Sequence, residues 1–154
     1  MLILIKWECG EIMTKKILGF IASDHRGFDL KELLKNKFPL IDLGTTNSEI
    51  KVDEVDYAKK LVKYVLKEKS TGILICGSGF GMDISANRHK GIRATLCKTL
   101  KDAEWARKHT DANIIVLSGE FTKPKDAEKI VKKFYNTKFD GLDRYKRRIK
   151  KMDK

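Results

Sequence analysis

Residues 71–87 read TGILICGSGFGMDISAN, an apolar segment that runs into Cys76 and then into a glycine-rich turn. The apolar run 72–76 predicts a buried strand, and the residues from Gly81 onward predict a short helix. Backbone amides in a glycine-rich turn before a helix face a common space and can hold an anion. The thiol of Cys76 stands beside that space, so the stretch predicts a small-molecule enzyme built around this cysteine.

Short apolar strands alternate with helical segments through the rest of the chain. Segment 52–69 has apolar residues at steps of three and four, and Pro124 suits the first turn of a helix. The predicted strands are 16–23, 39–44, 72–76, 92–97 and 113–118, and the predicted helices are 28–38, 52–69, 81–89, 100–109 and 124–135. This alternation predicts an α/β fold: a three-layer α/β/α sandwich with an open, five-stranded parallel sheet, Rossmann-like, plus a C-terminal helical tail.

Length and composition favour one domain. The chain has 154 residues, 42% of them hydrophobic, which suffices for one sizeable core. We expect residues 1–13 to be an N-terminal appendage and residues 14–154 to be a single domain. The cysteines Cys9, Cys76 and Cys97 form no CxxC pair, so neither a disulfide framework nor a structural zinc site is predicted. No segment reaches the length of a signal peptide or membrane span, and we expect a soluble, cytoplasmic protein.

The formal net charge of +12 suggests anionic partners. The lysines are spread over most helical segments, so a solvated surface is the simpler interpretation. The tail 144–154 is the exception, since it contains seven lysines and arginines and a single acidic residue, Asp153. Arg144 and Arg148 are one helical turn apart and can point to one phosphate, although a solvated basic helix remains an alternative. No DNA-binding or RNA-binding motif accompanies the tail, which disfavours a nucleic-acid partner.

The glycine turn matches neither common phosphate fingerprint. Met82 stands where GxGxxG requires its third glycine, and no GK[ST] follows. A nucleotide site is therefore not predicted, and a plain strand-to-helix connection stays open as an alternative. Cys76 can be a buried core cysteine, but the start of a helix lowers a thiol pKa and would make it a base or nucleophile. Cys97, within an apolar strand, is predicted to be a core residue.

Other polar residues lie next to the ends of predicted strands. Asp24 and His25 end the first strand, and His109 precedes the fifth. If the first and third strands are neighbours, Asp24, His25 and Cys76 face one crevice at the carboxyl edge of the sheet. Together with His109 they supply the acid, base and orienting groups that proton transfer requires.

Four longer stretches carry a resemblance to a known family. They are SDHRGFDLK (23–31), GILICGSGFGMDISANRHKGIRA (72–94), HTDAN (109–113) and FDGLDRYKRRI (139–149). The chain resembles the type B ribose-5-phosphate isomerases and the related galactose-6-phosphate isomerase subunits, over essentially residues 15–149. The resemblance implies aldose-ketose isomerisation of a sugar phosphate through an enediolate, without a metal or other cofactor. The substrate pair that it implies is ribose 5-phosphate and ribulose 5-phosphate. It also implies a homodimer, able to pair into a tetramer, with sites at the subunit interface.

The resemblance also implies roles for single residues. Cys76 matches the base, and His109 matches the acid that opens the furanose ring. Ser78 matches a hydroxyl that assists the base, and Asp24 matches a residue that holds the sugar hydroxyls. The other implied substrate-binding residues are His25, Tyr57, Gly77, Gly79, Phe80, Gly81, Thr110, Arg144 and Arg148. Among these, the glycine turn would hold the oxyanion and the two arginines would clamp the phosphate.

Some positions depart from the family pattern. The family often has DYPxYA where residues 53–58 read DEVDYA, so Glu54 and Val55 replace a tyrosine and a proline. Thr110 stands where asparagine is usual, and Glu120 where arginine is usual. These changes bear on substrate identity more than on reaction type. Two alternatives stay open: an isomerase of a six-carbon sugar phosphate, and a non-catalytic sugar-phosphate-binding protein.

Overall fold

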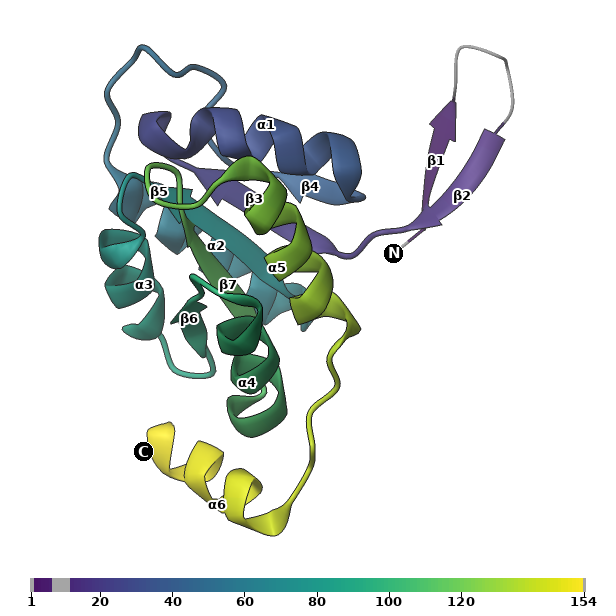
Figure 1. Cartoon of the computed structure of the whole chain (residues 1–154), viewed down its shortest axis with the longest axis vertical. Coiled ribbons are helices and arrows are strands. Elements are labelled where there is room, and N and C mark those ends of the chain that lie inside the picture. The colour runs from purple at the N-terminus through teal and green to yellow at the C-terminus, as the bar shows by residue number, and fades with distance from the viewer. Residues whose placement is uncertain (1, 7–11, 154) are drawn as a thin grey trace.

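The computed structural model describes residues 2–6 and 12–153, with side chains from Lys16 onward. Cys9, one of the three cysteines considered for a disulfide framework, lies outside the described residues. The main sheet contains β3 (Gly19–Ser23), β4 (Leu40–Asp42), β5 (Gly72–Cys76), β6 (Ala94–Leu96) and β7 (Ile114–Ser118) (Figure 1). The helices are η1 (His25–Gly27, a 3₁₀ turn), α1 (Phe28–Lys37), α2 (Glu54–Glu68), α3 (Phe80–Asn87), α4 (Leu100–Thr110), α5 (Pro124–Asn136) and α6 (Asp143–Met152).

The main sheet is parallel throughout, with strand order β4-β3-β5-β7-β6. The predicted open, five-stranded parallel sheet is therefore confirmed. β3 and β5 are direct neighbours, with Ser23 opposite Ile75. From β3 the chain crosses to β4 on one side and returns to β5 on the other, so this pair forms a topological switch point. Such a point leaves a crevice beyond the carboxyl ends of the strands.

Helices cover both faces of the sheet, as the alternation predicts. On one face, α1, α4 and α5 pack their apolar residues against side chains such as Ile73 and Ile75 of β5. On the other face, α2 and α3 pack against Leu74 and Cys76 of the same strand. Alternate residues of a strand point to opposite faces, so the position of Cys76 at the end of β5 sends its thiol toward α2 and α3. None of the helices in the described ranges is long and apolar enough to cross a membrane.

A second, two-stranded sheet lies at the amino-terminal end and was not predicted. β1 (Leu2–Lys6) and β2 (Ile12–Lys16) pair antiparallel, and Figure 1 shows them projecting from the sandwich. The single strand predicted over 16–23 is correspondingly divided, because β2 ends at Lys16 and β3 begins at Gly19. A side chain on Gly19 would collide with the carbonyl oxygen of Thr71, so close approach to the neighbouring connection fixes where β3 enters the sheet.

Candidate active site

Cys76 lies at the carboxyl end of β5 with only 4% of its surface exposed. The backbone amide of Gly79 donates to its Sγ atom at 3.2 Å. Gly79 has a φ of 87°, and a side chain there would also press on Leu96. Glycine adopts this left-handed conformation without strain. The turn is therefore fixed against the thiol by its own backbone.

The loop after β7 donates hydrogen bonds to the carbonyl groups at the start of this turn. Gly119 N donates to Cys76 O at 2.8 Å, and Glu120 N donates to Gly77 O at 3.1 Å. In the described part of the chain, the backbone amides of Gly77 and Ser78 donate no hydrogen bond. These two N–H groups are available to an anion beside the thiol, which is the arrangement that an oxyanion site requires.

The pKa of Cys76 moves in the direction opposite to the prediction. Burial raises the pKa of the thiol, and amide contacts from Met82 and Gly79 offset only part of that effect. The carboxylates of Asp24 and Glu54 raise the pKa of the thiol further. The prediction considered the helix start but not the acids that face the thiol in space. In the free protein the thiol form therefore dominates at neutral pH.

The residues after β3 reach the same edge of the sheet, as predicted for neighbouring strands. Asp24 is 4% exposed, and its Oδ1 accepts from Gly27 N at 2.9 Å, which caps the 3₁₀ turn. Burial raises the pKa of this carboxyl. The Nδ1 atom of His25 accepts from Val52 N at 3.3 Å, which assigns the proton of a neutral ring to Nε2. Asp24, His25 and Cys76 thus belong to one end of the molecule.

The start of α2 and the start of α3 meet beside the turn. The Glu54 carboxylate lies where a side chain on Gly81 would be, so it occupies the space next to the first turn of α3. Tyr57, one turn along α2, packs against the core cluster that contains Cys76. Ser78 Oγ accepts from the amide of Phe80 at 3.3 Å, and Phe80 itself is 53% exposed. The predicted site residues Tyr57, Ser78, Phe80 and Gly81 therefore gather at the Cys76 end.

Sequence reasoning missed one residue at this end, Arg26. An ideal side-chain carbon on Gly77 would lie 2.5 Å from Arg26 Cζ, so the guanidinium group lies directly on the turn. Its Nη2 atom donates to the carboxylate of Glu120, and the two side chains are 52% and 42% exposed. The pair is separated by 94 residues in the sequence, which holds no periodicity or motif that links them.

His109 lies in the last turn of α4, a helix with well-defined ends. A capping box of Thr99 and Asp102 starts it, and Asp111 ends it in the left-handed conformation with φ of 46°. The imidazole ring of His109 stacks on the ring of Tyr145 with centroids 4.8 Å apart. Trp105 lies on the same helix with its ring centroid 5.6 Å from that of His109. This aromatic group joins α4 to α6.

The two predicted phosphate-binding arginines surround the same tyrosine. The Cζ atoms of Arg144 and Arg148 lie 4.8 and 5.9 Å from the ring centroid of Tyr145. Tyr145 is only 8% exposed, so α6 is anchored by this ring while its guanidinium groups reach solvent. The hydroxyl of Thr110 donates to Ala106 O at 2.7 Å and is occupied within its own helix.

The structure separates the predicted site residues into two groups within one chain. β5 and β7 pair with Gly72 opposite Ile114 and Cys76 opposite Ser118. Gly72 N also donates to Asn113 O at 2.9 Å, so residues 109–113 lie where the parallel strands begin. We call this end of the strands the His109 edge, and the opposite end, where β5 ends, the Cys76 edge. Cys76 is four positions beyond Gly72 along β5, which corresponds to about 13 Å. His109, Thr110, Arg144 and Arg148 therefore share one edge, and Figure 1 shows α6 below the sheet, away from the start of α3.

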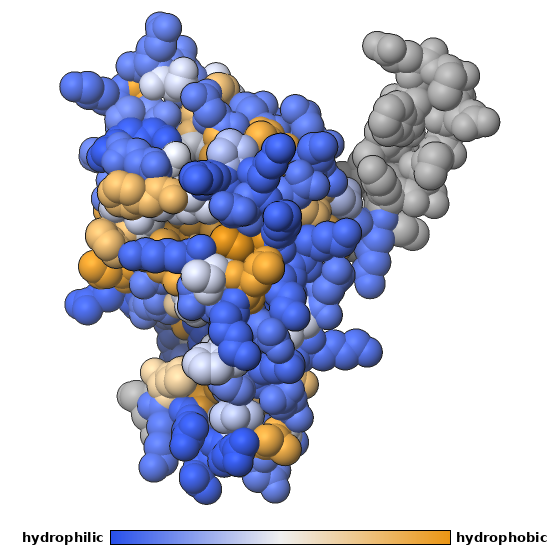
Figure 2. Space-filling model, in the orientation of Figure 1, coloured by the Kyte–Doolittle hydropathy of each residue, from blue (hydrophilic) through white to orange (hydrophobic). Residues whose placement is uncertain are grey.

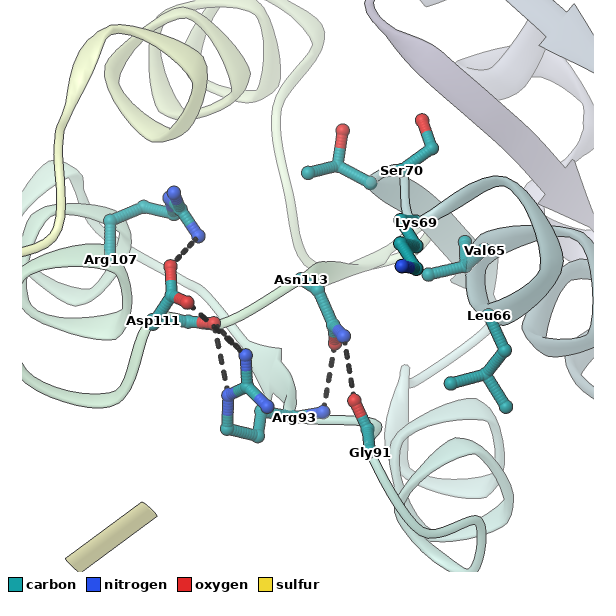
Figure 3. A pocket seen from close by; sticks show the side chains of 10 residues that line it. Val65, Leu66, Lys69, Ser70, Gly91, Arg93, Arg107, Asp111 and Asn113 are labelled. Atoms are coloured by element: carbon teal, nitrogen blue, oxygen red, sulfur yellow. Dashed lines mark hydrogen bonds and ion pairs between the residues drawn. The ribbon is translucent and has the colours of Figure 1, made fainter. Parts of the chain in front are cut away.

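Four polar residues that line a pocket at the His109 edge are joined by hydrogen bonds and ion pairs, as Figure 3 shows: Arg93, Arg107, Asp111 and Asn113. Asp111 accepts from Arg107 at 2.9 Å and from Arg93 at 3.3 Å. Asn113 accepts from the Arg93 amide and donates to the carbonyl oxygen of Gly91. These bonds tie the end of α4 to the start of β6, which gives the four residues a structural role. Within residues 2–6 and 12–153, no group of three or more His, Cys, Asp or Glu residues is arranged to hold a metal ion.

Comparisons with known proteins agree with one another. A family model described as Ribose/Galactose Isomerase matches residues 20–152. A putative sugar phosphate isomerase from Rickettsia bellii is 43% identical over 127 residues, which cover 79% of this chain and 88% of the relative. A ribose 5-phosphate isomerase from Thermotoga maritima has a crystal structure with a TM-score of 0.86 and 46% identity, covering 90% of this chain and 99% of its own. A ribose-5-phosphate isomerase B from Mycoplasma genitalium, crystallised with bound ribulose-5-phosphate, has a TM-score of 0.80 and 38% identity, covering 87% of this chain and 92% of its own.

Proposed function

The chain is an enzyme of the ribose/galactose isomerase family, and from this premise we propose that it interconverts ribose 5-phosphate and ribulose 5-phosphate. The observation that carries the proposal is the buried thiol of Cys76, held by Gly79 N beside the amides of Gly77 and Ser78, which donate no hydrogen bond to any described residue. A base and an oxyanion site in contact are what proton transfer next to a carbonyl requires. The cytoplasm is the proposed location, since the free thiols of Cys76 and Cys97 suit a reducing compartment.

In the proposed reaction the Cys76 thiolate removes the proton from C2 of the open-chain aldose. The electron pair of the broken C–H bond forms the C1–C2 double bond, and the carbonyl oxygen on C1 becomes the enediolate oxyanion. The amides of Gly77 and Ser78 donate to that oxyanion. Ser78 Oγ helps to pass the hydroxyl proton from O2 to O1, and the Cys76 thiol returns its proton to C1. The ketose leaves with the thiolate restored.

His109 and the arginines take part from a second copy of the chain. They lie at the opposite edge of the sheet from Cys76, so one chain does not hold a complete site. The outer face of α3 supports a docking surface beside the turn, because Phe80 and Ile84 are 53% and 63% exposed. Figure 2 shows apolar side chains gathered across the middle of the molecule in the region of α3. In a homodimer, His109 of one chain would open the sugar ring, and Arg144 and Arg148 would bind its phosphate.

The test is a panel of five- and six-carbon aldose phosphates, assayed with and without a chelator. We expect turnover of ribose 5-phosphate that survives the chelator. Cys76→Ala should lower kcat by a factor of about 10²–10⁴, the usual contribution of a positioned base. Cys97→Ala is the matched control, because Cys97 is also buried and its pKa is raised to about 12 by burial. Turnover of a six-carbon sugar phosphate alone would assign the other substrate class. Binding without turnover of any sugar in the panel would overturn the proposed reaction.

A further inference from the structure

The backbone around Arg26 is fixed by close approach on both sides. A side-chain carbon on Gly27 would lie 2.5 Å from the carbonyl oxygen of Ile75, and one on Gly119 would collide with the carbonyl oxygen of Arg26. Two glycines thus allow the 3₁₀ turn, the end of β5 and the loop after β7 to touch. The direction in which the Arg26 side chain leaves the backbone follows from these contacts, and it leads over Gly77.

The charges at this end make Arg26 distinctive. Asp24 and Glu54 are both negative neighbours of the Cys76 thiol and raise its pKa. An anionic substrate that enters here meets two carboxylates and the guanidinium group that lies on the turn. Glu120 raises the pKa of Arg26 through their hydrogen bond, so the guanidinium stays charged. The pair is half exposed, which leaves room for a ligand to reach it.

A guanidinium group has five N–H donors in a planar fork. One hydrogen bond, from Nη2 to the Glu120 carboxylate, is formed within the described residues. Most of the donors therefore remain for a second anion next to the Gly77 amide. The carboxylate of Glu120 fixes the plane of the Arg26 guanidinium group. Glu120 is itself held beside the turn, because its backbone N–H donates to Gly77 O.

We propose that Arg26 is a further substrate-binding residue that donates to an anionic oxygen of the sugar phosphate, and that Glu120 is the positioning residue that holds it over Gly77. The proposal rests on the proposed function for the identity of the ligand. The anionic oxygen belongs either to the phosphate group or to the enediolate. Both present the same chemistry to a guanidinium group, and the experiment separates them.

The test compares binding and kinetics in Arg26→Gln, Arg26→Lys and Glu120→Gln. Binding of ribose 5-phosphate and of inorganic phosphate is measured by calorimetry in a Cys76→Ala background, where turnover does not disturb the titration. KM and kcat are measured with Cys76 present. Arg26→Gln should weaken ribose 5-phosphate binding, or lower kcat, by about tenfold or more, the loss of one charge-assisted hydrogen bond. Arg26→Lys should recover part of the loss. Glu120→Gln should weaken ribose 5-phosphate binding or lower kcat by a smaller factor than Arg26→Gln, because the guanidinium group is kept but loses the partner that holds it over Gly77. Affinity that is unchanged or tighter in Glu120→Gln would contradict the positioning role.

The two sources of the anionic oxygen give different results. If Arg26 binds phosphate, Arg26→Gln weakens inorganic phosphate binding and raises KM. If it binds the enediolate, inorganic phosphate binding is unchanged and kcat falls. Lys67→Gln is the matched control, since it removes one positive charge from a surface ion pair with Glu68 on α2, and it should change neither quantity.

An ion pair with a purely structural role predicts another pattern. Arg26→Gln and Glu120→Gln would then lower the melting temperature together and leave affinity and kcat unchanged, which overturns the proposal. The assignment is separable from the proposed function. A wild-type protein without turnover whose binding depends on Arg26 contradicts the reaction alone, whereas an active enzyme indifferent to Arg26→Gln contradicts this inference alone.

Discussion

The two edges of the sheet carry different kinds of chemistry. At the Cys76 edge the groups that we propose to act on the substrate are mostly backbone: the amides of Gly77 and Ser78, and the Gly79 amide on the thiol. At the His109 edge they are side chains on helices, stacked around Tyr145. The first edge is close-packed and surrounded by carboxylates, and the second is cationic and open to solvent.

The difference explains why neither edge suffices by itself. A sugar phosphate needs cations for its phosphate group and a water-poor oxyanion site for its enediolate. The Cys76 edge offers the oxyanion site, but Asp24, Glu54 and Glu120 oppose a dianion there. The His109 edge offers Arg144, Arg148 and the imidazole of His109 for ring opening, but it lacks the Cys76 thiol that would move the C2 proton. Since about 13 Å of strand lies between the edges of one chain, we infer that the edges meet only between two chains.

Mixing two inactive variants tests that comparison most directly. Cys76→Ala damages one edge and His109→Ala the other, so each homodimer would have two defective sites. A mixed dimer has one site with both defects and one site with none. If the variants are unfolded together and refolded at equal amounts, half of the dimers are mixed, and about a quarter of the wild-type activity should return.

Matched controls make the complementation result decisive. Two variants of the same edge, Cys76→Ala with Ser78→Ala, should not restore activity when mixed, because every site then has a damaged Cys76 edge. Return of activity in this control would point to contamination. If the Cys76→Ala and His109→Ala mixture stays inactive although it forms dimers, the edges do not share a site.

The fold could be predicted from the sequence because its signals are local. Apolar runs such as 72–76 and the three-and-four spacing of 52–69 define strands and helices whatever their neighbours are. The neighbouring positions of β3 and β5, and hence of Asp24 and Cys76, followed from the common strand orders of such sheets. The antiparallel pair of β1 and β2 was missed because no helical segment follows either strand, so the strand-helix alternation that identified the other strands does not extend to residues 1–13.

The site was less predictable because its energetics depend on contacts in space. The start of a helix predicts a lowered pKa for Cys76, but burial and two carboxylates from distant segments reverse the direction. Glu120 was identified as a departure from the family pattern, yet its partner Arg26 lies 94 residues away. The separation of Cys76 from His109 also required the register of β5 with β7. The roles predicted for the single residues remain to be tested.

The two arginines of α6, Arg144 and Arg148, give a prediction for the His109 edge. Arg144→Gln and Arg148→Gln should each raise the KM for ribose 5-phosphate by about tenfold or more, because each removes a charge-assisted hydrogen bond to the phosphate. kcat should change less, since the phosphate stays bound during proton transfer. Arg147→Gln removes the same charge from the same helix without the contact to the Tyr145 ring, and it serves as the control in steady-state assays. Equal effects of all three changes would mean that α6 acts only through its net charge.

Glu54→Gln tests the acidic side and should have the smallest effect. The pKa of Cys76 is raised by burial and by the carboxylates of Asp24 and Glu54, so the reactive thiolate forms only as the pH rises through that pKa. Removing one negative charge lowers the pKa of the thiol, and the rising limb of kcat/KM against pH should move to lower pH. We expect a modest gain at neutral pH and an unchanged plateau at high pH, where the thiolate is already formed.

The control is Glu68→Gln, the same change at the far end of α2. It should leave the pH profile where it is, because Glu68 is not among the carboxylates that raise the pKa of Cys76. Glu54 also begins α2, and a negative charge there stabilises the helix by about 0.3–1 kcal/mol, so melting temperatures are compared with the pH profiles. A limb that stays fixed in Glu54→Gln would mean that the carboxylate does not act on the thiol. A limb that moves to higher pH would mean that Glu54 hydrogen-bonds within the site and helps to ionise Cys76.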